Sequence, residues 1–167
     1  AYVSGGDADD FREAMETLRE NYPPAAFYSA MNFLGTHDTP RILTLLGTDH
    51  TPESKADRAD YRLLPWERSR AAAKLRLASL VLFTFPGSPM IYYGDEAGME
   101  GFEDPLNRGT YPWGHEDRDL LAWFSRLGAL RNGYPVLQTG ALRWLCTAGP
   151  LLAFAREDGQ VRLVTAV

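Results

Sequence analysis

Helical and strand-like hydrophobic patterns alternate along most of this chain, and that alternation limits its fold more than any other feature. Residues 9–21 carry apolar side chains at helical spacing, and the Tyr-Pro-Pro sequence at 22–24 ends that helix. The apolar run at 27–34, rich in aromatic residues and followed by Gly35, predicts a strand buried on both faces. A strand between helices is typical of parallel α/β folds.

The same alternation continues after a polar connection at 48–64. Pro65 suits the first turn of a helix, and residues 66–83 predict a long helix whose second half is apolar on almost every face. Residues 89–93 predict a second short strand, and residues 117–131 predict another helix. The chain up to this point therefore predicts an α/β fold with helices against a parallel sheet.

The last part of the chain has a different pattern. Residues 151–155 and 161–166 flank a Glu-Asp-Gly turn at 157–159, which is typical of a β-hairpin. We therefore predict two domains, an α/β portion at residues 1–136 and the beginning of an antiparallel β domain at residues 137–167.

Composition argues against several classes of partner. The 17 basic and 22 acidic residues give a net charge of −5, so we expect no nucleic acid and no anionic membrane as partner. The longest apolar stretch, 77–85, is far shorter than the roughly 20 residues that span a bilayer. The single cysteine, Cys146, excludes an internal disulfide and favours the cytoplasm, with secretion left open. Both ends read as mid-sequence, so we expect a piece of a longer protein.

Polar side chains gather directly after the first predicted strand. The sequence GTHDTPR at 35–41 includes His37, Asp38 and Arg41, and βα folds place their active sites at the carboxyl ends of strands. A carboxylate there can accept a hydrogen bond from a sugar hydroxyl and stabilise a developing oxocarbenium ion, while the imidazole donates to another hydroxyl. The alternative is that Asp38 caps the following turn and His37 merely packs.

Two further groups of charged residues follow the second predicted strand. Asp95 and Glu96 are adjacent, and neighbours on an extended chain point to opposite sides, so they cannot form a facing catalytic pair. We interpret them as structural, pairing with an arginine or capping the loop. The long loop at 96–114 carries Asp104 and Arg108, which can grip vicinal hydroxyls or form a local salt bridge.

Three linked motifs resemble glycoside hydrolase family 13, the α-amylase family. They are MNFLGTHDTPR at 31–41, FPGSPMIYYGDE at 85–96 and DPLNRGTYPW at 104–113. The first is most similar to the neopullulanase, cyclomaltodextrinase and maltogenic amylase group. The resemblance implies the C-terminal part of a (β/α)8 barrel, with strands seven and eight and their helices, followed by the start of an all-β domain.

The resemblance also implies roles for the residues singled out above. Asp38 resembles the acid that binds substrate hydroxyls and stabilises the transition state without being nucleophile or proton donor. His37 resembles the histidine beside it that binds sugar hydroxyls, and Asp104 and Arg108 resemble the loop pair that holds the next glucose. The family's nucleophile and acid/base follow strands four and five, so the resemblance places both outside this sequence.

The function implied is that of part of a retaining α-glucan hydrolase of the cyclomaltodextrinase or neopullulanase type, which cleaves α-1,4 bonds. The alternatives are another α-amylase-family enzyme, such as an α-amylase or α-glucosidase, and a catalytically inactive carbohydrate-binding or interaction relative. The expected partners are an α-glucan oligosaccharide and either the remainder of the barrel or another copy of the chain. We expect no cofactor and no metal.

Overall fold

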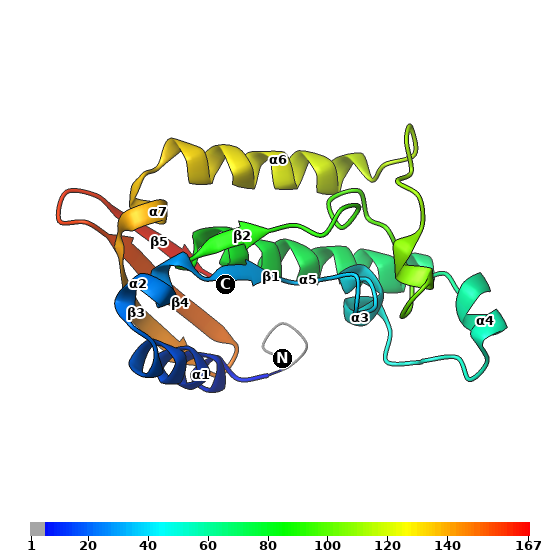
Figure 1. Ribbon diagram of the computed structural model, residues 1–167, viewed down its shortest axis with the longest axis horizontal. Coiled ribbons are helices and arrows are strands. Elements are labelled where there is room, and N and C mark those ends of the chain that lie inside the picture. Colours follow the sequence, from blue (N-terminus) through cyan, green and yellow to red (C-terminus); the bar gives the residue numbers. More distant parts are fainter. Residues whose placement is uncertain (1–5) are drawn as a thin grey trace. The chain divides into compact units, whose positions relative to one another are not determined.

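The computed structural model of this chain describes residues 6–167 (Figure 1). It contains two compact units, each assembled from separate stretches of sequence. The first unit comprises Ala1–Asn32, Leu80–Pro89 and Leu127–Val167, and the second comprises Phe33–Ser79 and Met90–Arg126. This division does not follow the predicted domain boundary at 136/137, which stays a prediction.

Helix α1 (Ala8–Asn21) confirms the predicted helix at 9–21. It begins where the Asp7 carboxylate accepts a hydrogen bond of 2.7 Å from the Asp9 N–H, as expected of a helix-capping aspartate. It ends at Tyr22, directly before two prolines, the second of which opens the next helix.

The predicted strand at 27–34 is wrong over most of its length. Helix α2 (Pro24–Ser29) takes up its first half, and strand β1 (Met31–Phe33) is only three residues long. A proline in the first turn and two alanines after it favour the helix, and a short apolar run alone cannot separate the two structures. Burial on both faces is wrong too, because Met31 and Phe33 are 61% and 49% exposed.

Strand β2 (Ser88–Met90) is shorter than the predicted strand at 89–93. The chain turns instead at 92–95, where the Asp95 N–H bonds to the Tyr92 carbonyl at 3.1 Å. Strands β1 and β2 pair with each other as a two-stranded sheet.

The predicted hairpin near the end of the chain is confirmed. Strands β3 (Ala141–Ala148), β4 (Leu151–Glu157) and β5 (Arg162–Ala166) form an antiparallel sheet in that order. Helix α1 lies against this sheet (Figure 1). The core of this unit combines aromatic and aliphatic side chains, and its buried members are Ala8, Phe27, Phe85, Leu142, Leu152 and Phe154.

One fully buried arginine ties the sheet to its surroundings in the first unit. The Arg156 guanidinium donates to the carbonyls of Gly140, Leu137 and Thr84, at distances of 2.8 to 3.2 Å. Burial lowers the pKa of Arg156 to about 10. Carbonyl acceptors therefore replace the water that this cation loses. The short helix α7 (Val136–Thr139) supplies one of them and was not predicted.

The second unit is mostly helix and loop. Helix α3 (Ile42–Gly47) follows β1, and helix α4 (Lys55–Asp60) lies in the polar connection at 48–64, where no helix was predicted. The Ser54 hydroxyl caps α4 by accepting a hydrogen bond from the Asp57 N–H at 3.1 Å. A capping serine is typical of a helix start, but the polar composition of this segment resembles that of a loop.

The two long predicted helices are confirmed as α5 (Pro65–Thr84) and α6 (Arg118–Gly133). Burial of the apolar half of α5 is confirmed in part, since Leu75 is fully buried but Leu77 is 47% exposed. No helix within residues 6–167 has the length and apolar character needed to cross a membrane.

Candidate active site

The turn after β1 carries His37 and Asp38, and two threonines shape it. The Thr36 N–H donates to the Thr39 hydroxyl at 3.1 Å, and the Asp38 N–H donates to the Thr36 hydroxyl at 3.2 Å. Hydroxyls that bond to nearby backbone stabilise turns of this kind. The local sequence THDT therefore shapes the backbone around Asp38.

The four predicted site residues come together around this turn. The side chains of His37 and Asp38 are 62% and 73% exposed, and His37 Nε2 lies 3.3 Å from Asp38 Oδ1. Arg108 Nη2 lies 4.0 Å from the same oxygen, and Arg108 Nε lies 2.7 Å from Asp104 Oδ1. Two segments that are distant in sequence thus present their charged groups to solvent side by side.

These contacts bear on the structural alternatives that the sequence left open. Helix α3 begins after Arg41 without a side-chain cap, so the Asp38 carboxylate does not serve as a helix cap. His37 is exposed and does not pack in a core. The Asp104–Arg108 salt bridge does form, and both side chains remain about half exposed, so it leaves room for a ligand.

The loop that carries Asp104 and Arg108 is bonded to the segment after β1 at two points. The Arg41 N–H donates to the Gly101 carbonyl at 2.8 Å, and the Gly101 N–H donates to the Thr44 hydroxyl at 2.9 Å. The Asn107 side chain donates to the His37 carbonyl at 2.8 Å. These bonds hold the two halves of the site against each other.

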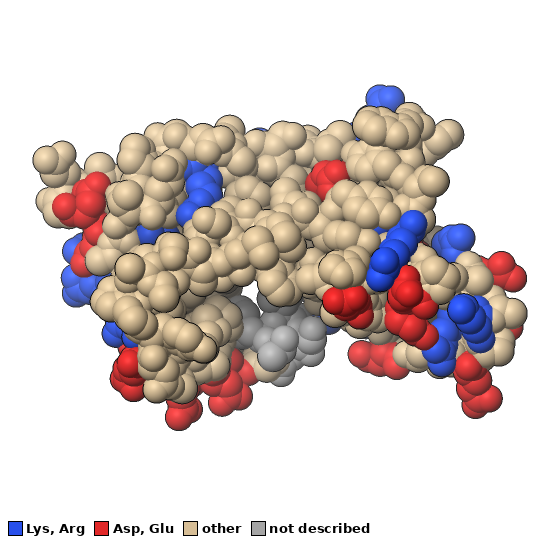
Figure 2. Space-filling view, in the orientation of Figure 1, with Lys and Arg blue, Asp and Glu red and all other residues tan. Residues whose placement is uncertain are grey.

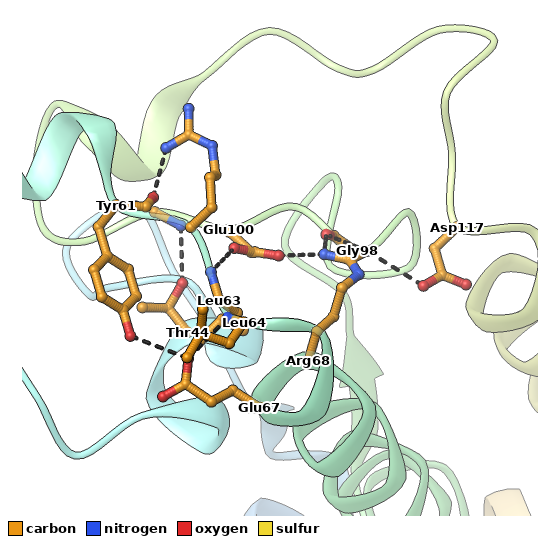
Figure 3. Close-up of polar contacts among 11 residues, drawn as sticks. Thr44, Tyr61, Leu63, Leu64, Glu67, Arg68, Gly98, Glu100 and Asp117 are labelled. Carbon is orange, nitrogen blue, oxygen red and sulfur yellow. Dashed lines mark hydrogen bonds and ion pairs between the residues drawn. The ribbon is translucent and has the colours of Figure 1, made fainter.

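Arg68, in the first turn of α5, anchors both ends of the same loop (Figure 3). Its guanidinium donates to the Gly98 carbonyl at 3.1 Å, pairs with Glu100, and lies 3.2 Å from Asp117 Oδ2. Glu100 in turn accepts from the Leu63 N–H at 2.8 Å. A planar guanidinium suits such a role because its several donors have fixed directions.

A buried ion pair lies beneath the turn. Arg41 is 1% exposed, and its Nη1 lies 3.2 Å from Asp95 Oδ1. Its guanidinium carbon is 4.3 Å and 4.6 Å from the ring centres of Tyr92 and Tyr93, within cation–π range. A β-carbon at Gly35 would lie 2.8 Å from Asp95 Oδ2, so a larger residue there would require the Asp95 carboxylate to shift. The structural interpretation of Asp95 is supported by this pairing.

Burial raises the pKa of Asp95 to about 6, and the nearby Arg41 guanidinium opposes that rise only in part. A folded-state pKa above the unfolded value means that the fold favours the protonated acid. The resulting stabilisation is present in full below about pH 4 and is lost as the pH rises through about 6.

We therefore expect Asp95→Asn to remove a pH dependence of stability. Between pH 4 and pH 7, the free energy of unfolding of the unsubstituted protein should fall by up to about 3 kcal/mol relative to that of Asp95→Asn. Denaturant unfolding of both proteins at several pH values measures this difference. A difference that stays constant over the range would show that Asp95 titrates normally.

The exposed carboxylate, imidazole and guanidinium together offer acceptors and donors that suit sugar hydroxyls. Among the described residues drawn in Figure 2, basic and acidic side chains are interspersed on the surface shown. Within residues 6–167, no cluster of three His, Cys, Asp or Glu residues could hold a metal ion.

Sequence reasoning missed two residues that support the site. Asn107 stands inside the DPLNR motif, between Leu106 and Arg108, and nothing in that sequence indicates that its side chain is buried. Arg68 gave no signal, because nothing in a helix of mixed charge indicates which arginine reaches a loop 30 residues away.

Comparison with known proteins identifies the family of this chain. The sequence profile of the alpha-amylase catalytic domain matches residues 3–128, well over half of the chain. The chain belongs to the α-amylase family. The resemblance seen in the three motifs is thereby confirmed, and the α/β fold class agrees with it. The numbering of the strands within a barrel and the start of a C-terminal domain stay predictions.

Similar proteins include glycoside hydrolases of the α-amylase family. The chain is 42% identical over 151 residues to an amylopullulanase of Thermoanaerobacter thermohydrosulfuricus, which covers 90% of this chain and 10% of that protein. It is 33% identical over 156 residues to a cyclomaltodextrinase of Geobacillus thermopakistaniensis (strain MAS1), which covers 91% and 23%.

A solved structure gives the same answer for the fold. The debranching enzyme of Nostoc punctiforme, soaked with acarbose, matches 97% of this chain and 29% of its own, with a TM-score of 0.76 and 29% identity. The chain therefore spans 10% to 29% of the lengths of these three proteins.

Proposed function

We propose that these 167 residues are part of a retaining α-glucan hydrolase of the cyclomaltodextrinase or neopullulanase type. In this proposal Asp38 stabilises the transition state, and His37 binds a sugar hydroxyl beside it. Asp104 and Arg108 hold the neighbouring glucose. The observation that carries the proposal is the convergence of these four side chains into one exposed site.

The proposed chemistry follows from the charges. As the glycosidic bond breaks, the sugar ring becomes oxocarbenium-like, and a carboxylate close to it stabilises the positive charge. A retaining mechanism also requires a nucleophile and an acid/base about 5 Å apart. We propose that both come from parts of the enzyme outside these residues, so that this chain contributes the third acid.

A second candidate is an enzyme of the amylopullulanase type. It is favoured by identity, which is 42% with the amylopullulanase and 33% with the cyclomaltodextrinase. The two candidates differ in substrate preference rather than in the proposed role of Asp38. Relative rates of the full-length enzyme on cyclodextrin, pullulan and maltotriose separate them, and failure to cleave any of the three would contradict both.

For Arg108→Ala in the full-length enzyme we expect a loss that grows with substrate length. The Arg108 guanidinium pairs with Asp104 at 2.7 Å but lies 4.0 Å from Asp38, so its proposed contact is with a sugar away from the reacting carbon. kcat/KM should fall more for maltohexaose than for maltotriose.

The matched control for this prediction is Arg162→Ala, because Arg162 Nε makes the same 2.7 Å contact with Glu157 in the first unit. It should leave kcat/KM unchanged for both substrates. Equal losses on both lengths in Arg108→Ala would favour a purely local salt bridge.

A further inference from the structure

Asn107 stands directly before Arg108, and its side chain grips the backbone on both sides of Asp38. Asn107 is 0% exposed. Its Nδ2 donates to the His37 carbonyl at 2.8 Å and to the Thr39 carbonyl at 2.8 Å. A single amide group thus bridges the two residues that flank Asp38.

The direction of this amide is fixed by its acceptors. If it turned by 180°, Oδ1 would face two carbonyl oxygens, which cannot donate a hydrogen bond. In the present direction Oδ1 is buried and has no partner among the described residues. An unpaired buried acceptor costs free energy. The two hydrogen bonds from Nδ2 to the turn are the interactions that offset this cost.

Asp38 depends on its backbone for its position. Its carboxylate is 73% exposed, and its polar neighbours are His37 Nε2 at 3.3 Å and Arg108 Nη2 at 4.0 Å. Contacts between exposed polar side chains are too weak to fix such a carboxylate by themselves. The carboxylate therefore lies where the turn places it, and Asn107 reaches that turn from the loop that bears Arg108.

We propose that Asn107 is a positioning residue for Asp38. Its amide fixes the position of the turn relative to the loop that carries Asp104 and Arg108. Asp38 and the Asp104–Arg108 pair can then contact the same substrate molecule. This inference rests on the proposed role of Asp38. Because misplacing a reacting group by about 1 Å can cost about 10²-fold in rate, Asn107 should affect catalysis without touching substrate.

The test replaces Asn107 in the full-length enzyme by leucine, which has a similar shape and no donor, and by serine, which keeps one donor. Asn107→Leu should lower kcat about 10- to 100-fold, with KM changed less than about threefold. Asn107→Ser should retain more of kcat than the leucine variant. The serine hydroxyl can replace at most one of the two bonds, so Asn107→Ser should still lower kcat, and it tests the inference if the leucine variant fails to fold.

The control is Asn32→Leu. The Asn32 Nδ2 also donates to a distant backbone carbonyl, that of Pro86 at 2.6 Å, but this bond lies in the first unit and flanks no site residue. The control should lower the melting temperature comparably and leave kcat near its normal value. If Asn107→Leu and Asn32→Leu lower kcat equally, Asn107 is a structural residue and the inference is wrong.

A double-mutant cycle with Asp38→Asn separates this inference from the proposed function. If Asn107 acts through Asp38, Asn107→Leu should lower kcat much less in the Asp38→Asn background than in the parent. Fully multiplicative losses would overturn the positioning role while leaving Asp38 as the proposed stabiliser. A harmless Asp38→Asn would instead refute the proposed function itself.

Discussion

Asp38→Asn in the full-length enzyme should lower kcat by about 10²-fold or more while KM changes little. The substitution keeps the size of the side chain and removes its charge. That charge matters most when the sugar ring becomes positive, so its loss weakens transition-state binding selectively. Steady-state kinetics on maltotriose and on a cyclodextrin measure both constants.

The control for this prediction is Asp10→Asn, which removes an exposed carboxylate from the first turn of α1. It should leave both kinetic constants unchanged. If Asp38→Asn had a near-normal kcat and only a raised KM, Asp38 would be a simple hydroxyl-binding residue, and the proposed role in the transition state would fail.

The 167-residue chain on its own should hydrolyse no α-glucan, which is the largest effect expected. The proposal assigns the nucleophile and the acid/base to parts of the enzyme outside these residues, and the third acid cannot break the bond alone. Incubation with maltotriose and cyclodextrin, followed by an assay for reducing ends, measures this. Turnover that survives repurification and is lost in Asp38→Asn would mean that the catalytic acids are misassigned.

The same chain should not be a stable monomer in solution. Strand β1 exposes Met31 and Phe33, at 61% and 49%, and β1 and β2 form a sheet of only two strands. Unpaired strand edges and exposed apolar side chains favour association. Light scattering coupled to size exclusion should therefore give a mass above the 18.6 kDa of one chain. A monodisperse monomer with a sharp melt would contradict this expectation.

Segments with a long hydrophobic pattern, a capping residue or a turn sequence could be predicted, and short segments could not. Helices α1, α5 and α6 and the β4–β5 hairpin have long patterns, caps or a turn sequence, and all were predicted. The segment at 24–34 failed because six helical residues and three strand residues are too short for periodicity to register. Helix α4 was missed because its polar composition resembles a loop.

The candidate site residues gave clearer sequence signals than the residues that support them. Polar or charged side chains directly after a predicted strand or in a long loop are recognisable as site candidates from the sequence. The structure brings four of them together: His37, Asp38, Asp104 and Arg108. Asn107 and Arg68 act through backbone carbonyls far away in the sequence. No local pattern encodes such partners, since they depend on how distant segments meet.

The most direct test of the central claim compares the binding of two ligands to the full-length enzyme and to Asp38→Asn. One ligand is a cationic, oxocarbenium-like inhibitor, and the other is a thio-linked maltotriose that is not cleaved. If Asp38 stabilises positive charge on the sugar ring, calorimetry should show about 10²-fold weaker binding of the inhibitor and nearly unchanged binding of the maltotriose analogue. Equal weakening for both ligands would contradict the account.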